Sequence, residues 1–302
     1  MCEMKPIIEA VPREELEREL TADKKIRNTN KAHNEIYVVT AVNSPAVMRE
    51  IGRLREVSFR EAGGGTGEEV DIDEDDLATD GYQQLIVWDP AAREIVGGYR
   101  YIISHSSNPA HLSTEHYFRF SEQFREEFLP YTIELGRSFV QPRYQSRDNN
   151  KSIFALDNLW DGLGALVVLN PEIRYFFGKV TMYTNFDVEA RNMIIYFMHR
   201  YFPDNDKLIE GLDPVEMDID YEKFDAMFTG TDYNEDHRTL CQQVRARGET
   251  IPPLINSYMS LSPTMRVFPT VHNNDFGAVE ETGILITIAD IYPAKGERHM
   301  KF

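Results

Sequence analysis

The sequence predicts a mixed α/β (α+β) fold in which a central sheet is flanked by helices. Short runs rich in β-branched and aromatic residues alternate with longer stretches of helical periodicity along most of the chain. Two of these short runs are separated by a turn that begins with Asp89-Pro90, which is typical of a hairpin. Helices are expected between most of the other strands, and this order favours one sheet covered by helices.

Start signals and apolar spacing define the elements of the first half. Pro12 begins a helix over residues 12–20, and the run EIYVVTA over 35–41 is expected to be a strand. Ser44-Pro45 combines a helix cap with proline in the first turn, and helical spacing continues to about residue 61, before the glycines at 63–65. The next elements are expected to be strands over 84–88 and 95–104 and a helix over 117–128.

The second half continues the alternation. We expect strands over 131–140, 179–184 and 283–292, and helices over 152–169, over 188–201 and from Pro252-Pro253 onward. Residues 203–250 are polar and acidic and are expected to form a helical insertion. The predicted organisation is an N-terminal helical extension (1–34), a core (35–202), the acidic helical insertion (203–250) and a C-terminal helix and strands that complete the same domain (251–302).

Composition narrows the class of protein. The chain has 302 residues, of which 42% are hydrophobic and 11% aromatic, enough for a sizeable core. A net charge of −18 argues against a nucleic-acid partner, because phosphate backbones need a basic face. No stretch approaches the roughly 20 apolar residues of a membrane span, and the charged N-terminus lacks the apolar run of a signal peptide. We therefore expect a cytoplasmic protein. Its two cysteines, Cys2 and Cys241, predict neither a disulfide framework nor a metal site.

A basic loop stands out in this acidic chain. Arg143, Arg147 and Lys151 precede the helix expected over 152–169, whereas residues 68–76 form an acidic run. Helix N-termini bind anions through free N–H groups and the helix dipole, so this loop is a candidate site for an anionic ligand. A solvated polar loop is the alternative.

A second group of polar residues lies on the predicted strand 131–140. Glu134 and Arg137 are three residues apart, which places them on opposite faces of a regular strand. Gly136 between them permits a bulge, and one extra residue would bring both to the same side. Arg100 on the preceding strand is expected to face the same cleft. An arginine can clamp a carboxylate and a glutamate can accept a proton from an amine; a cross-strand salt bridge from Glu134 to either arginine is the structural alternative.

The helix over 152–169 carries an apolar stripe that includes Trp160. Ile153, Leu156, Leu163 and Val167 share its helical spacing. Such a stripe is usually part of the core, and it could equally line a tunnel for an acyl chain. The sequence leaves both interpretations open.

A series of short motifs resembles a known family. In order, these are Arg55-Glu56-Val57-Ser58-Phe59-Arg60, the acidic segment Asp71 to Asp76, Ile95-Val96-Gly97-Gly98-Tyr99-Arg100, Glu134-Leu135-Gly136-Arg137-Ser138-Phe139-Val140, Leu159-Trp160-Asp161-Gly162, and the late segment from Pro252-Pro253 to Asp275-Phe276-Gly277. The series resembles the hemolysin-like N-acyltransferases of the GNAT superfamily, which include the ornithine-lipid and glycine-lipid N-acyltransferases. It is more distantly similar to acyl-homoserine-lactone synthases.

The resemblance implies a GNAT fold and direct transfer of a fatty acyl group from a thioester to the amine of an amino acid such as glycine or ornithine. No cofactor would be bound permanently, and the co-substrate would be an acyl carrier protein thioester or acyl-CoA. By position, the family's motif residues correspond to Arg55, Phe59, Arg100, Glu134 and Arg137, with Glu134 as the base or the group that orients the amine. Trp160 would contact substrate. Tyr196 is the candidate acid for the leaving thiolate, although its spacing from Ala190 departs from the common pattern.

One departure from the family bears on the donor. The R/Q-x-x-G-x-G/A loop that grips coenzyme A is replaced by Gln141-Pro142-Arg143-Tyr144-Gln145-Ser146, which favours a carrier-protein donor. The expected donor-binding residues are Val140, Arg143, Arg147 and Lys151, with Arg174 and Lys179 extending a docking patch for the acidic carrier protein. The product would be amphiphilic, which suggests peripheral contact with the inner membrane surface. Two alternatives remain open: an acetyltransferase that uses acetyl-CoA and a small amine, and a non-catalytic membrane-active protein.

Overall fold

The computed structural model describes residues 4–145 and 152–300. Its strands are β1 (Lys25–Asn28), β2 (Glu35–Val39), β3 (Gln83–Asp89), β4 (Glu94–Ile103), β5 (Phe118–Phe120), β6 (Thr132–Val140), β7 (Tyr175–Met182), β8 (Ile209–Gly211), β9 (Arg266–Asn273) and β10 (Val279–Thr287). Its helices are α1 (Arg13–Glu19), α2 (Pro45–Ala62), α3 (Glu74–Leu77), α4 (Ser152–Leu169), α5 (Val188–Tyr201), α6 (Tyr221–Met227), α7 (Tyr233–Ala246), α8 (Pro253–Met259) and α9 (Pro293–Met300). Within the described ranges, no helix combines the length and the apolarity needed to cross a membrane.

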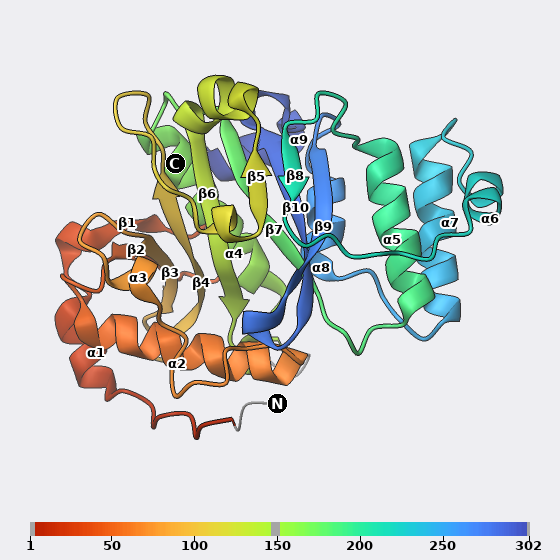
Figure 1. Ribbon diagram of the computed structural model, residues 1–302. Helices are drawn as coiled ribbons and strands as arrows, with labels where there is room; N and C mark the ends of the chain where they lie inside the picture. The colour runs from red at the N-terminus through yellow and green to blue at the C-terminus, as the bar shows by residue number, and fades with distance from the viewer. Residues whose placement is uncertain (1–3, 146–151, 301–302) are drawn as a thin grey trace.

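Eight strands form one sheet in the order β1-β2-β3-β4-β6-β7-β10-β9, which confirms the predicted mixed α/β class (Figure 1). All neighbours in this sheet are antiparallel except β6 and β7. Strands β5 and β8 pair in a separate two-stranded sheet. The C-terminal strands β10 and β9 extend the main sheet beyond β7, so residues from both ends of the chain build it.

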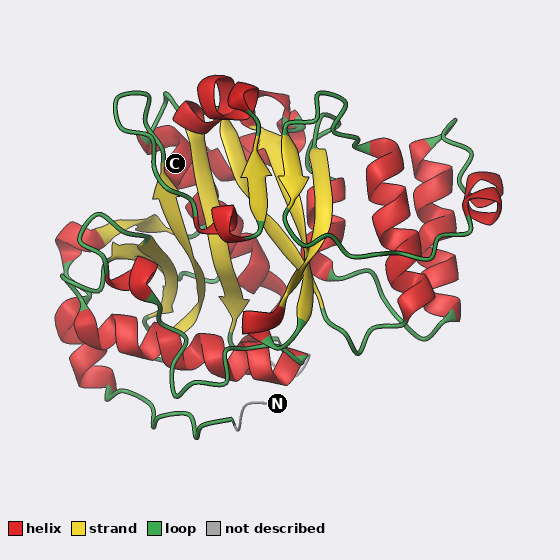
Figure 2. Cartoon of the chain, viewed as in Figure 1, coloured by secondary structure: helices red, strands yellow, loops and turns green. Residues whose placement is uncertain are grey.

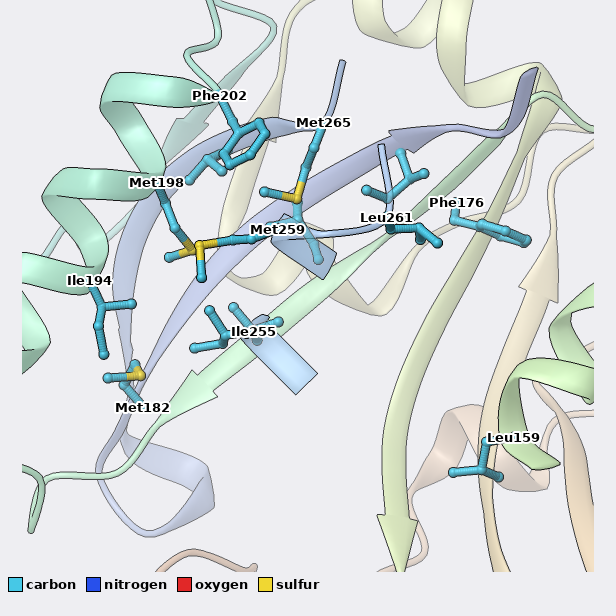
Figure 3. Close-up of a cluster of buried hydrophobic side chains, with 14 of the residues drawn as sticks. Leu159, Phe176, Met182, Ile194, Met198, Phe202, Ile255, Met259, Leu261 and Met265 are labelled. Carbon is cyan, nitrogen blue, oxygen red and sulfur yellow. The ribbon is translucent and has the colours of Figure 1, made fainter. Parts of the chain in front are cut away.

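Helices cover the sheet on both faces (Figure 2). On one face, α1 and α2 pack against β2 and β3, and the β5–β8 sheet packs against β7, β9 and β10. Alternating residues of the same strands point to the other face, where the largest apolar cluster joins the sheet to α4, α5 and α8. Figure 3 shows Met198 of α5 directed toward Met259 of α8 within this cluster. The two faces therefore differ in what covers them, and this difference shapes the site described below.

The sheet opens between β6 and β7. The two strands pair only over Thr132–Leu135 and Tyr175–Gly178. Beyond these residues β6 continues alongside β4, and β7 continues alongside β10. Because the two strands follow partners on opposite sides, a gap opens after Leu135 and Gly178.

A bulge lies at the edge of this gap. The pairing between β4 and β6 steps from Gly98 opposite Phe139 to Arg100 opposite Gly136, so one extra residue is accommodated in β6. Arg137 in the bulge has a left-handed φ of 50°, a backbone conformation that is uncommon for a residue other than glycine. The predicted bulge is therefore present in this strand, one residue after Gly136.

The helix predicted over residues 117–128 is wrong in its first half. Phe118 and Phe120 are buried and Arg119 is exposed, and these three residues form β5. Their partner is β8, about 90 residues further along the chain, so local periodicity could not reveal the pairing. Residues Phe124–Phe128 form a π-helical turn.

The last strand begins four residues before the predicted position. Glu280 and Glu281 are buried in β10, where they form ion pairs with Arg191 and Lys179 respectively. Two adjacent glutamates argue against a strand when their partners are unknown, because unpaired buried carboxylates are costly. Strands β1 and β8 and helices α3 and α9 were also not predicted, and β9 was expected only as one of the C-terminal strands without bounds. The strand predicted over 179–184 is β7, which begins at Tyr175, and the strand predicted over 283–292 ends at Thr287.

Asp161 ties α4 to both ends of the chain and provides a test of the fold. Its fully buried carboxylate accepts hydrogen bonds from the Asn30 main-chain N–H (2.8 Å) and the Asn30 side-chain amide (2.7 Å), and His299 Nδ1 of α9 lies 2.8 Å away. Asp161→Ala leaves these groups without their acceptor and is expected to lower the free energy of unfolding by about 3 kcal/mol. Urea denaturation measures this loss. Asp157→Ala, which removes a carboxylate that is paired with exposed Arg298, is the control and should cost less than about 1 kcal/mol.

Candidate active site

Two cavities lie on opposite faces of the sheet and meet at the gap between β6 and β7. Each has a volume of about 250 Å³. Gly136, Arg137 and Lys179 line both of them. The gap therefore connects the two faces of the sheet at the bulge.

The cavity on the α4 and α8 face, called the apolar cavity below, has mainly hydrophobic walls. Trp160 of α4 and Tyr258 of α8 meet edge to face, with their ring centroids 5.7 Å apart. Phe59 of α2 also lines it and packs on Phe276. The α4 stripe thus lines a cavity as well as the core, and further walls come from Leu156, Leu159, Leu163, Ile255, Ile284 and Ile286.

The cavity on the opposite face, called the polar cavity below, is bordered by charged and polar groups. Asp73, Glu74 and Asp75 lie on one side of it and Ser113 and Tyr117 on another. Arg100, Arg137 and Lys179 supply three positive charges. A space of this kind suits a small zwitterion.

Glu134 lies beside the polar cavity, beneath its lining residues. The side chain is buried, and its Oε1 accepts a hydrogen bond from the Thr114 N–H at 3.1 Å. Its Oε2 accepts from the Ser113 N–H at 3.0 Å and from the Tyr82 hydroxyl. The Ser113 hydroxyl lies 3.4 Å from the same oxygen and borders the cavity. A proton can therefore pass from the cavity to Glu134 through Ser113.

Burial gives Glu134 the pKa of a useful base. Loss of hydration raises the pKa of Glu134 to about 8, although the hydrogen bonds from Thr114 and Ser113 and the charge of Lys179 act in the opposite direction. A carboxylate with a pKa close to the working pH can both accept and release a proton.

Arg100 is held in a salt-bridge cluster. Its Nη1 lies 2.7 Å from both carboxylate oxygens of Asp73 and 3.3 Å from Asp76, and its guanidinium stacks on the Tyr82 ring. Burial alone would raise the pKa of Asp73, but Arg100 and then Arg137 outweigh it and lower that pKa to about 2. The alternative of a Glu134 salt bridge to Arg100 or Arg137 is wrong, because the two arginines pair with the acidic segment.

Arg137 is less tightly bound than Arg100. Its Nη1 lies 3.4 Å from Asp71 and its Nη2 3.5 Å from Asp73, and its guanidinium stacks on the Phe276 ring at 4.7 Å. Arg137 and the next residue, Ser138, also form the bulge in β6. Arg137 and Ser138 have no partner residue in the ladders with β4 and β7, so the regular pairing of β6 is interrupted at the edge of the gap.

Arg55 does not reach either cavity. It is fully buried, and its Nη1 bonds Asp76 at 3.0 Å while its Nη2 bonds Gln84. Its place in the structure is to hold the acidic segment against α2, so a direct contact with substrate is excluded in this arrangement. Phe59, predicted with it, does line the apolar cavity.

Three other predicted residues line neither of the two cavities. Tyr196 of α5 faces α6, where its hydroxyl donates to Asp225 and its ring packs on Phe224. Val140 ends β6 opposite Gly97. Arg143 pairs with Glu94 at 2.6 Å.

The structure does not support one basic docking patch. Arg147 and Lys151 lie outside the described residues. Arg174 precedes β7 and Arg143 follows β6, so the length of the parallel strands, about 30 Å for nine residues, separates them. Lys179 lines the cavities and pairs with the buried Glu281 at 2.6 Å.

Sequence reasoning did not identify Tyr82, Ser113 or Tyr117 as site residues. Ser113 belongs to a 3₁₀ turn (Ser113–His116) in a segment without a motif, and Tyr82 precedes a strand. No local signal marks these residues, because the fold alone brings Tyr82 and Ser113 to Glu134 and Tyr117 to the polar cavity. Among the described residues, no group of three or more His, Cys, Asp or Glu side chains is placed to hold a metal ion.

Comparison with known proteins bears on the chemistry of this site. Residues 54–154 match the family model described as an acetyltransferase (GNAT) domain. The chain is 52% identical over 305 residues to a glycine N(alpha)-acyltransferase of Phocaeicola vulgatus, covering 99% of this chain and 93% of that protein. It is 50% identical over 304 residues to a glycine N(alpha)-acyltransferase of Bacteroides thetaiotaomicron, covering 99% and 90%. A solved structure of a CoA-dependent acyl-homoserine lactone synthase with SAM and isopentyl-CoA aligns with a TM-score of 0.31 and 18% identity over 53% of this chain and 72% of that one.

Proposed function

The chain belongs to the glycine N(alpha)-acyltransferase family and is an N-acyltransferase with a GNAT domain, and on this premise we propose that it moves a long-chain fatty acyl group from an acyl thioester to the amine of glycine. The product, an N-acyl amino acid, would be the first intermediate of an amino-acid-containing lipid. It is amphiphilic, and we extend the proposal to its release at the inner membrane surface.

The meeting of the two cavities at the bulge is the observation that carries this proposal. The acyl chain would occupy the apolar cavity, whose walls include Trp160, Leu163 and Tyr258. The amino acid would occupy the polar cavity, beside Ser113 and Lys179. The thioester carbonyl would then lie in the gap, where the two substrates approach from opposite faces. Positioning of this kind supplies much of the acceleration of a two-substrate reaction.

The reaction is a direct transfer. The amine nitrogen attacks the thioester carbonyl and loses a proton, which passes through the Ser113 hydroxyl to Glu134. Main-chain N–H groups at the Arg137–Ser138 bulge, where the regular pairing of β6 is interrupted, would stabilise the oxyanion. The C–N bond forms, the C–S bond breaks, and the thiolate leaves and takes up a proton.

An acyl carrier protein remains the proposed donor, because the coenzyme A loop of many GNAT enzymes is replaced by residues 141–146. Since Arg174 and Lys179 do not extend a common surface with Arg143, docking is assigned to residues 143–151 alone. Acyl-CoA of the same chain length is the competing donor.

Mass spectrometry of products tests the proposal. Purified protein is incubated with a 16-carbon acyl carrier protein, or with the matching acyl-CoA, and a pool of amino acids that includes glycine and ornithine. N-acylglycine as the main product, formed far more slowly with Glu134→Gln, is the expected result. N-acylornithine as the main product would correct the acceptor. Consumption of acetyl-CoA with a small amine, and no long-chain product, would overturn the lipid proposal in favour of acetyl transfer.

A further inference from the structure

Three cationic side chains, Arg100, Arg137 and Lys179, line the polar cavity, and they differ in how many carboxylates pair with each of them. Arg100 is in contact with Asp73, Asp75 and Asp76. Its side chain is 4% exposed. A substrate carboxylate would have to displace at least one of these three acids, of which Asp76 is fully buried, to reach it. Arg100 is therefore a structural cation.

Arg137 has two acidic neighbours and is also part of the bulge in β6. It faces Asp71 and Asp73, and it occupies the left-handed position of the bulge. The stacking of its guanidinium on Phe276 fixes the side chain along the wall of the gap. This arrangement positions the main chain for the thioester.

Lys179 has one acidic partner and lies where an amino acid would sit. It follows Gly178, the last residue of β7 that pairs with β6. Strand alternation puts Lys179 on the same face as Phe177, which is opposite Glu134 in the ladder. Its Nζ lies 2.6 Å from Glu281 Oε1 and 4.8 Å from the centre of the Tyr117 ring. An ammonium has three donors, and Glu281 accepts one of them.

Glu281 is itself held in place. Its Oε2 accepts from the Thr181 hydroxyl at 2.9 Å, and its Oε1 also accepts from the Asn273 amide at 3.1 Å. The carboxylate is buried in β10. It therefore anchors the ammonium of Lys179 at the gap.

We propose that Lys179 binds the carboxylate of the amino-acid acceptor and directs the adjacent amine toward Ser113 and Glu134. This assignment rests on the proposed function and adds the group that recognises the acceptor as an α-amino acid. The acceptor class follows from the geometry: an amine with a carboxylate on the neighbouring carbon, because Lys179 and Ser113 border the same small cavity.

Steady-state kinetics with glycine and glycinamide as acceptors test the assignment. Glycinamide keeps the amine and replaces the carboxylate by a neutral amide. Lys179→Met should raise KM for glycine about tenfold or more, since a charge-assisted hydrogen bond is lost. KM for glycinamide should change less than about threefold, and Lys179→Arg should restore part of the glycine affinity.

Two further variants keep the test decisive. Lys179→Met leaves Glu281 buried without its cation, so the double variant Lys179→Met with Glu281→Gln removes that penalty while keeping the loss of the ammonium. Arg174→Met removes an exposed cation that stacks on Tyr131 just before β7 begins, at the end of the strand remote from the gap, and should leave both KM values unchanged. Thermal unfolding verifies that each variant is folded.

The outcomes separate the assignment from the proposed function. Equal losses with glycine and glycinamide in the folded double variant would show that Lys179 supports the structure, and the assignment would fall while N-acylation of glycine stood. If the wild-type protein acylated neither acceptor with a long-chain donor, the proposed function itself would fail.

Discussion

Replacing Glu134 by glutamine is expected to lower the turnover number by about 10²- to 10⁴-fold without loss of the fold. The glutamine keeps the size of the side chain, and its single amide oxygen can accept the hydrogen bond from either Ser113 or Thr114, which bond different oxygens of the wild-type carboxylate. It cannot take a proton from the amine. Single-turnover measurements with a long-chain donor and glycine measure the effect on chemistry separately from product release.

A matched control distinguishes this effect from a change of surface charge. Glu126→Gln removes a carboxylate from the exposed side of the π-helical turn and should leave turnover unchanged. If Glu134→Gln retained more than about half of the wild-type rate, the role of Glu134 as proton acceptor would be excluded, and the amine would have to lose its proton to solvent.

The pH profile provides an independent test of the same role. The base must be ionised to act, and burial raises the pKa of Glu134 to about 8. The contribution of Glu134 to the rate should therefore rise with pH up to about 8 and level off above it. Ionisation of the glycine amine contributes equally to the wild-type protein and to Glu134→Gln, so the difference between the two profiles reports Glu134. A constant ratio of the two rates between pH 6 and 9 would contradict this role.

Filling the apolar cavity with Leu163→Trp is expected to select against long acyl chains. Leu163 borders this cavity from α4 and is buried. An indole at this position would exclude about four methylene groups, each contributing about 0.8 kcal/mol when buried. The ratio of kcat/KM for a 16-carbon donor to that for an 8-carbon donor should fall about 10²-fold.

The same helix offers a control and a complementary variant. Val168→Trp places the indole on the exposed side of α4, where the wild-type residue is 48% exposed, and the ratio should not change. Trp160→Ala enlarges the cavity and should shift the preference toward longer chains. Leu163→Trp also risks overpacking, so its thermal unfolding is measured alongside. An equal loss with both donors in a folded variant would place the acyl chain elsewhere.

The sequence by itself determined the class of fold and the strand that carries the bulge. Periodicity and start signals located α2, α4 and α5 to within a residue or two, because the apolar spacing of each helix is local to its own segment. Gly136 next to Glu134 and Arg137 marked the strand that bulges. These features are local, so they can be read without knowing which segments meet.

Only the tertiary structure shows which carboxylates pair with each of the charged side chains near the site. Arg55, Arg100 and Arg137 look alike in the sequence, yet their acidic neighbours differ in number and in burial. Lys179 seemed to be a surface cation, and pairing of β7 with β10 places it at the gap beside Glu281. The free energy of a charge depends on its hydration and on neighbours from distant parts of the chain. Because of that dependence, the sequence could single out Glu134 as a candidate, whereas only the folded chain shows that Ser113 contacts Glu134 and that Lys179 lines the same cavity as Ser113.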